Sequence, residues 1–148
     1  MDAVRSWLII GGYRDTKNPD LIKAYGIKAI LQLAAPVEHP NVDLLYLPVN
    51  DGHPLPFDAI REGVAFVRAH KAQGHTVLVA CGAGVSRSAA FTTAALKEEE
   101  GLSLLDAYRE VKARHSSALP HPEIWESLMA YYDEGPPFLE LMALTGQS

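Results

Sequence analysis

The sequence predicts a small α/β fold in which a central, mostly parallel sheet is flanked by helices in three layers. Short apolar segments alternate with segments of helical periodicity in the first half of the chain, and helical patterns dominate the second half. The chain has 148 residues and an ordinary globular composition, 48% hydrophobic and 21% charged. We therefore expect one domain that spans 1–148.

Four short apolar segments are expected to form the sheet, and glycines or turn-forming residues follow them. Gly11-Gly12 ends the first segment, and the third leads into the turn-rich Asn50-Asp51-Gly52. Ligands of parallel sheets bind beyond the carboxyl ends of the strands, so these ends are where we expect a site. The expected strands are Trp7–Ile10, Ile27–Leu33, Leu44–Val49 and Thr76–Ala80.

Capping residues and apolar spacing predict five helices. Asn18 provides a capping side chain and Pro19 a favourable first helical residue, and Ser103 with Asp106 forms a second capping pair. Glu98-Glu99-Glu100 is interpreted as the solvated end of the third helix. The expected helices span about 18–25, 57–71, 86–100, 103–114 and 120–134, and Gly135-Pro136-Pro137 ends the last one.

Charge and residue usage exclude several classes of partner. The net charge is −5 without a basic cluster, so we expect neither a nucleic acid nor a membrane partner. No apolar run approaches the roughly 20 residues of a membrane span, and the N-terminus lacks a signal-peptide pattern. A single cysteine forms no internal disulfide, which favours the cytoplasm. The six histidines are scattered, so we expect no metal and no cofactor, and we expect a monomer.

The segment around the only cysteine carries the strongest functional signal. An apolar strand runs into Cys81, small residues follow, and Arg87 lies six positions after the cysteine, at the start of a helical pattern. Backbone N–H groups in such a loop and the positive end of the next helix bind an anion and favour the thiolate. The guanidinium of Arg87 matches two phosphoryl oxygens, and Ser88 is placed to donate to the sulfur. The residues expected to bind phosphate are Gly82, Ala83, Gly84, Val85, Ser86 and Arg87.

Breaking a phosphate ester requires a proton donor for the leaving group, and Asp51 is the best candidate for this general acid. It follows a predicted strand and lies thirty residues before the cysteine. The competing interpretation is a turn-forming aspartate before Gly52. Asp58 is the nearest alternative, although we expect it to open the next helix, and His53 is close enough in sequence to contact a substrate.

The segment Cys81–Ala89 closely resembles the signature of the cysteine-dependent dual-specificity protein phosphatases, Cys-x5-Arg-Ser/Thr. The similarity extends over most of the chain and implies a small, atypical member with the phosphatase II-like fold. It also implies a phosphocysteine intermediate, the general acid at Asp51 and no metal. Two departures stand out. Ala80 occupies the place of the usual histidine, and His121 that of the commoner asparagine.

The expected function is therefore hydrolysis of phosphotyrosine, and of phosphoserine and phosphothreonine if the pocket is shallow. A second hypothesis is the same chemistry on a phosphoinositide, a nucleotide or an RNA 5′ end, although the loop lacks the lysine of relatives that act on such substrates. A third is a module that binds phosphate without turnover, which Ala80 would favour. Sulfur transfer through a persulfide is a fourth.

Overall fold

A five-stranded sheet with the strand order β1-β2-β5-β3-β4 forms the centre of the molecule. The computed structural model describes residues 1–134, so the expected helix end at Gly135-Pro136-Pro137 lies outside the described residues. β1 pairs antiparallel with β2, and all other neighbouring strands are parallel. The strands are β1 Asp2–Arg5, β2 Leu8–Gly12, β3 Ile27–Gln32, β4 Asp43–Tyr46 and β5 Thr76–Cys81.

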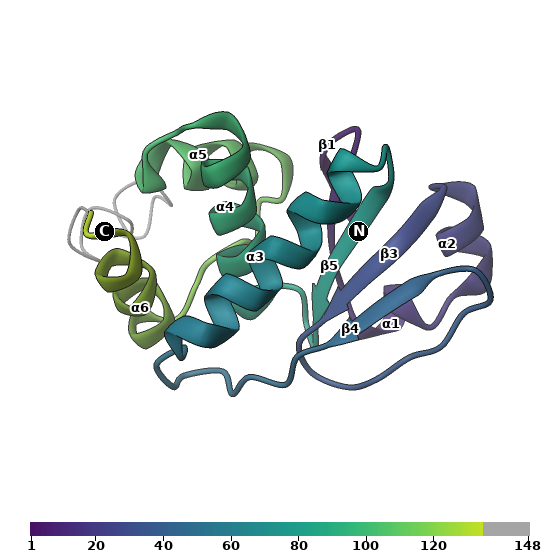
Figure 1. The fold of residues 1–148 in the computed structure, drawn as a ribbon. Helices are drawn as coiled ribbons and strands as arrows, with labels where there is room; N and C mark the ends of the chain where they lie inside the picture. The colour runs from purple at the N-terminus through teal and green to yellow at the C-terminus, as the bar shows by residue number, and fades with distance from the viewer. Residues whose placement is uncertain (135–148) are drawn as a thin grey trace.

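Helices cover both faces of the sheet, which confirms the three-layer α/β prediction (Figure 1). α1 and α2 lie on one side with a small apolar cluster, and α3 to α6 lie on the other side with the main core. Side chains alternate between the two faces along each strand, so apolar strands need helices to cover them on both sides. The helices are α1 Tyr13–Thr16, α2 Pro19–Ala24, α3 Phe57–Ala72, α4 Arg87–Glu100, α5 Leu104–Arg114 and α6 Pro122–Tyr132.

The alternation along β5 decides where the cysteine points. Val77, Val79 and Cys81 belong to the main core on the side of α3 to α6. Leu78 and Ala80 belong to the small cluster on the side of α2. The side chains of Ala80 and Cys81 therefore lie on opposite faces of the sheet, and only Cys81 is directed toward the helix that follows the loop.

α4 is the central helix of the larger layer. Every residue from Ser88 to Leu96 is buried, because the sheet, α3, α5 and α6 surround the helix. Its alanines allow these neighbours to approach closely on all sides. This segment has accordingly no charged residue and mostly small ones. Its packing fixes the position of the start of α4 under the loop.

The acidic end of α4 reaches solvent, as the sequence interpretation expects, and its carboxylates also form ion pairs at the surface. Arg68 contacts Glu98 at 3.2 Å and Glu99 at 2.9 Å, and Lys71 contacts Glu99 at 2.8 Å. Arg5 forms two hydrogen bonds with Glu100, at 2.7 and 2.9 Å. These cations come from α3 and β1, so the pairing depends on tertiary neighbours that no local pattern indicates.

Several element bounds differ from the sequence prediction, and β2 continues through Gly11 and Gly12, which are expected from the sequence to end it. β1 and the single turn α1 were not expected, because four-residue elements carry too few positions for a periodic signal. β4 ends at Tyr46 rather than at residue 49. The next residues still follow β3 for a short distance, since Leu47 N–H donates to Gln32 O and Val49 N–H to Leu33 O.

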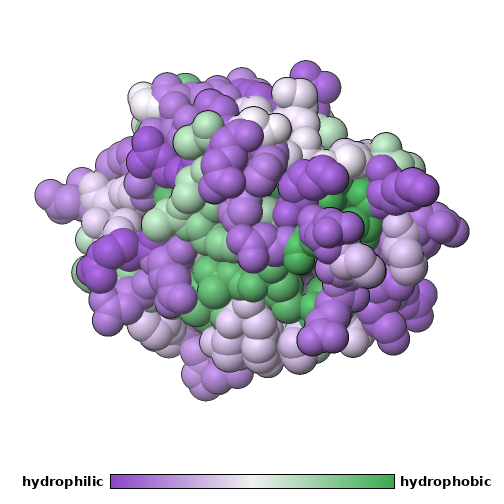
Figure 2. All heavy atoms as spheres, turned by 45° about the vertical axis from the view of Figure 1, so that its right-hand side comes forward, coloured by the Kyte–Doolittle hydropathy of each residue, from purple (hydrophilic) through white to green (hydrophobic). Residues whose placement is uncertain are grey.

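Figure 2 shows the side of β3, β4 and α2 turned forward, where an apolar area is bordered by hydrophilic residues. Val37, Val42 and Leu44 are partly buried and pack against the small cluster beneath this side. Among residues 1–134, no helix has both the length and the apolar character needed to cross a membrane.

Candidate active site

Cys81 is the last residue of β5, and Arg87 is the first residue of α4. The cysteine side chain is buried, with 2% of its surface exposed. Its Sγ lies 3.3 Å from Oγ of Ser88, so the thiol donates to the hydroxyl here and a thiolate would accept from it. The strand end and the first turn of α4 thus bring the two side chains together as the sequence predicts.

Three carbonyl groups of the loop are held by donors outside it. Gly82 O accepts from Tyr13 N–H at 2.9 Å, and Val85 O accepts from Leu119 N–H at 3.0 Å. Gly84 O lies 2.7 Å from Nε2 of the buried His115. In a trans peptide, the carbonyl and the following N–H point in opposite directions. The N–H groups of residues 83, 85 and 86 are therefore turned away from these outer partners and toward the interior of the loop.

The N–H groups of residues 82–87 have no acceptor within the described part of the chain. α4 also starts without a side-chain cap, because Ser86 Oγ instead accepts from His121 N–H at 2.8 Å. Unpaired N–H groups at a helix N-terminus carry partial positive charge. The loop is consequently an anion-binding nest with the sulfur of Cys81 at its start. We refer to residues 82–87 as the cradle.

Gly84 allows the cradle to lie directly against the end of β2. Its φ angle is +75°, and a Cβ atom there would lie 2.9 Å from both C and O of Gly11. Gly12 is equally close-packed, since a Cβ atom there would lie 2.9 Å from Gly82 O. Backbone atoms cannot rotate away, so a side chain at either position would displace the cradle.

Arg87 turns back across the cradle. Its Nη1 donates to Val49 O at 3.0 Å, and a Cβ atom on Gly82 would lie 3.2 Å from its Nη2. Its Nε is buried and has no hydrogen-bond partner among the described residues. The guanidinium Nε and the six N–H groups of the cradle are therefore donors that are available to bind the oxygen atoms of an oxyanion.

The structure places Asp51 on an exposed turn after β4 and links that turn to the cradle. Val49, two residues earlier, holds Arg87, and a Cβ atom on Gly52 would lie 3.5 Å from Nε2 of His121. Among residues 1–134, the Asp51 carboxylate accepts a hydrogen bond only from Gly52 N–H, at 3.1 Å. Asp58 lies in the first turn of α3 and pairs with Arg61 at 2.7 Å.

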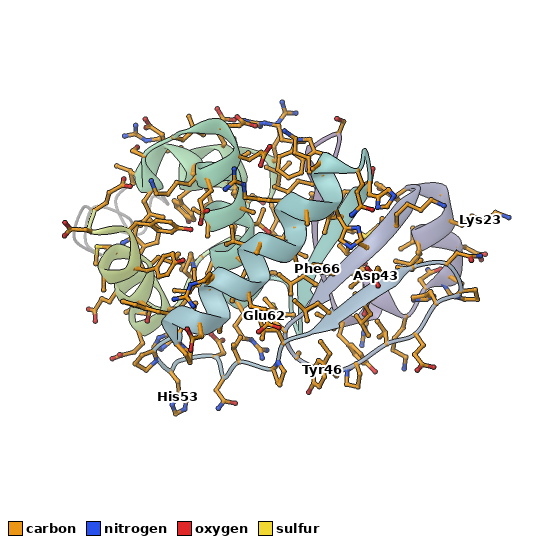
Figure 3. The ribbon with its side chains drawn as sticks, in the orientation of Figure 1. Lys23, Asp43, Tyr46, His53, Glu62 and Phe66 are labelled. Carbon is orange, nitrogen blue, oxygen red and sulfur yellow. The ribbon has the colours of Figure 1, made fainter. Side chains whose placement is uncertain are left out.

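Asp58 and His53, the two other candidates from the sequence, make no contact with the cradle. His53 is exposed on the loop between β4 and α3 and points outward, as its label in Figure 3 shows. Within residues 1–134, no three His, Cys, Asp or Glu side chains converge as metal ligands would. Of the polar candidates, only Cys81, Ser86, Arg87 and Ser88 therefore form a contiguous group around the cradle.

Sequence reasoning missed the residues that hold the cradle from outside. Tyr13 and Leu119 act through their backbone, so their identity carries no signal. His115 acts through its ring, which also approaches Asp2 Oδ2 at 2.6 Å. A histidine directly after a predicted helix carries no local signal for either of these distant partners.

Comparison with known proteins agrees with this geometry. Residues 8–134 match the family model described as the dual specificity phosphatase catalytic domain. Human dual specificity protein phosphatase 14 is 32% identical over 136 residues, which cover 86% of this chain and 67% of that protein. Mouse dual specificity protein phosphatase 8 is 30% identical over 131 residues, which cover 84% of this chain. The chain spans only about a fifth of the length of that relative (20%).

The fold is also that of solved relatives. The crystal structure of human DUSP28 superposes with a TM-score of 0.84 and 28% sequence identity, and the match covers 100% of both chains. The expected phosphatase II-like architecture is therefore confirmed at the level of the fold.

Proposed function

We infer that this chain, which belongs to the dual specificity phosphatase family, is a cysteine-dependent phosphatase that hydrolyses phosphate monoesters on proteins. The expected substrates are phosphotyrosine together with phosphoserine and phosphothreonine. The site residues proposed from the sequence keep their roles: Cys81 as nucleophile, Arg87 and the cradle as oxyanion ligands, Asp51 as general acid and Ser88 as the hydroxyl partner of the sulfur.

One observation carries this proposal. The unpaired N–H groups of residues 82–87 and the unpaired Nε of Arg87 surround the start of α4 directly after the nucleophile. These donors are already fixed in the protein, because the loop carbonyls are held from outside. Donors fixed in advance stabilise the charge that develops in a phosphoryl transition state without reorganisation.

In the proposed first step, the Cys81 thiolate attacks phosphorus and the bond from phosphorus to the ester oxygen breaks. Asp51, protonated, gives its proton to that oxygen as the alcohol or phenol leaves. The phosphoryl group remains on sulfur as a phosphocysteine. In the second step, Asp51 removes a proton from water, the water oxygen attacks phosphorus, the phosphorus–sulfur bond breaks with its electron pair on sulfur, and inorganic phosphate leaves. Ser88 then donates to the thiolate that re-forms.

The placement of the acid supports a role for the Asp51 turn beside the cradle. Arg87 joins the two segments through its hydrogen bond to Val49 O, and His121, whose N–H donates to Ser86 Oγ, has its ring near Gly52 of the turn. The turn is exposed, so Asp51 is free to approach a bound ester from the solvent side. An acid on an exposed turn, without a covering insertion, would suit a substrate with a short phosphorylated side chain.

Two alternatives are less favoured. A phosphoinositide, nucleotide or RNA phosphatase would use the same cradle, but residues 82–86 contain no lysine for additional phosphate groups. A non-catalytic phosphate-binding module would not require Cys81, Ser88 and Arg87 in one contiguous group. We further propose a single catalytic domain over 1–148, a monomer, no nucleic-acid or membrane partner and a cytoplasmic location.

The test is phosphate release from phosphotyrosine, phosphothreonine and phosphoinositide substrates by wild type, Cys81→Ser and the control His75→Gln, which lies just before β5 at its opposite end. We expect release from the phosphopeptides by wild type and His75→Gln but not by Cys81→Ser. Trapping a phosphoryl group on sulfur by acid quenching would support the covalent step. If wild type releases no phosphate but binds phosphopeptides, the binding module replaces the phosphatase; if phosphoinositide is the preferred substrate, the protein substrate is wrong.

A further inference from the structure

The side chain before the cysteine cannot hold the cradle in this protein. Ala80 has no polar side-chain atom, and it lies in the small cluster on the face of the sheet opposite to Cys81. The polar side chain that contacts a cradle carbonyl from outside comes from a different element. It is His115, the residue directly after α5.

The position of the His115 ring is determined on several sides. Its backbone N–H donates to Val111 O at 2.8 Å, and its carbonyl accepts from Ala118 N–H at 2.9 Å. The residue is only 9% exposed. Nε2 lies 2.7 Å from Gly84 O, and Nδ1 lies 2.6 Å from Asp2 Oδ2 on β1. The ring thus connects the first strand of the sheet with the middle of the cradle.

Both ring nitrogens face acceptors. A backbone carbonyl accepts hydrogen bonds and never donates them, and an ionised carboxylate does the same. A neutral imidazole carries one N–H and would leave one of these two contacts unsatisfied, whereas the imidazolium donates to both. The hydrogen-bonding geometry therefore matches a charged His115, with Asp2 as its counter-ion and Gly84 O as its second acceptor.

We propose that Asp2 and His115 form a charged positioning pair that fixes the Gly84–Val85 peptide and directs the Val85 N–H into the cradle. The inference rests on the proposed function only in that the cradle must bind an oxyanion. The pair touches no reacting atom. It acts by orienting the Gly84–Val85 peptide. It also places a positive charge behind the cradle, which attracts an anionic ligand electrostatically.

Few other charged groups of the described residues lie near His115. Arg14 and Asp15 of α1 and Met1 line the same small pocket, and the Met1 ammonium group lies 3.8 Å from Asp15. Ser117 Oγ lies 3.3 Å from Nε2 and is neutral. None of these groups takes the place of Asp2 at Nδ1, so substitutions at positions 2 and 115 test the pair selectively.

The experiment measures tungstate inhibition and the kinetics of an aryl phosphate for wild type, His115→Gln, His115→Leu, Asp2→Asn and His75→Gln. Tungstate is a tetrahedral dianion, so its own charge stays constant near neutral pH. Glutamine keeps one donor for Gly84 O but loses the charge, and leucine loses both. Because a hydrogen bond from a charged donor contributes about 1.5–3 kcal/mol, we expect His115→Leu to raise the tungstate inhibition constant roughly 10- to 100-fold and His115→Gln less.

The split between KM and kcat separates positioning from a merely structural role. The effect should fall on KM and on the inhibition constant more than on kcat, because the peptide contacts the oxyanion in both the ground and the transition state. Asp2→Asn should also weaken tungstate binding, because an amide holds the imidazolium less strongly than a carboxylate.

Folded His115→Gln and Asp2→Asn proteins with wild-type tungstate affinity would overturn the proposal. An equal loss in His75→Gln would also overturn it, since that histidine does not touch the cradle. If His115→Leu does not fold, the tungstate affinities of His115→Gln and Asp2→Asn still test the proposal. Failure of wild type to bind tungstate at all would instead contradict the proposed function.

Discussion

Replacing Gly84 by alanine tests the close packing of the cradle against the end of β2. The position combines two obstacles: φ is +75°, and the added Cβ would lie 2.9 Å from Gly11 C and O and 3.1 Å from Gly12 N. Gly74 is a matched control, because its φ is +78° and a Cβ there meets nothing within 4 Å. Both substitutions thus share the backbone strain, and only Gly84→Ala adds the collision.

The magnitudes follow from these contacts. The left-handed conformation costs an alanine about 1–2 kcal/mol, and the smaller entropy of the unfolded chain offsets about 0.4–1 kcal/mol, so Gly74→Ala should lower stability by about 0–1.6 kcal/mol. Overpacking against immobile backbone adds about 1–3 kcal/mol at Gly84. The free energies of unfolding of the two variants should therefore differ by about 1–3 kcal/mol.

Urea unfolding followed by tryptophan fluorescence measures this difference, because Trp125 is fully buried. The slope of the free energy against urea should stay the same, so that the midpoints report stability alone. Tungstate affinity should fall in Gly84→Ala and stay unchanged in Gly74→Ala. If both variants are equally stable and bind tungstate equally well, the cradle does not lie against Gly11 and Gly12 as described.

Two further predictions concern the proton donor and a buried phenol. Asp51→Asn should lower kcat for alkyl phosphates by about 10²- to 10⁴-fold and less for aryl phosphates with good leaving groups, whereas Asp58→Asn should leave both unchanged; the opposite result would assign the acid to Asp58. Burial raises the pKa of Tyr108 to about 12, and its hydroxyl donates to Ala118 O at 2.6 Å. The raised pKa means that the neutral phenol stabilises the fold fully below its unfolded value of about 10, and that this contribution is lost as pH rises through about 12. Tyr108→Phe should remove that alkaline loss of stability in unfolding measurements; an unchanged pH profile would show that the phenol is not the group responsible.

The sequence predicted the elements that have their own local signal. The strand before Cys81, the small residues of the cradle and the helix that begins at Arg87 are contiguous, so spacing alone brings Cys81, Arg87 and Ser88 to one end of the strand. Asn18 and Ser103 cap α2 and α5 as expected, and their side chains accept from the first turns of those helices. Capping depends on neighbours two or three residues away, which is why it can be recognised in a single sequence.

The contacts that orient the cradle had no such signal. Gly84 O and His115 are separated by 31 residues, and Asp2 and His115 by 113. The pairing of Glu98, Glu99 and Glu100 with cations of α3 and β1 likewise depends on how layers pack. A sequence reveals which residues can form hydrogen bonds, but the choice of partner depends on tertiary distances.

The outer supports of the cradle also constrain when the site can form during synthesis. Tyr13 belongs to the first helix, whereas His115, Leu119 and His121 lie beyond α5, so both ends of the described chain must reach the loop. A ribosome makes Cys81 before these later supports, and non-local contacts form slowly because a long loop must close first. A nascent chain that already contains the cysteine strand therefore still has a loop whose peptides are not oriented. The ability to bind an oxyanion should therefore arise only as the last helices dock.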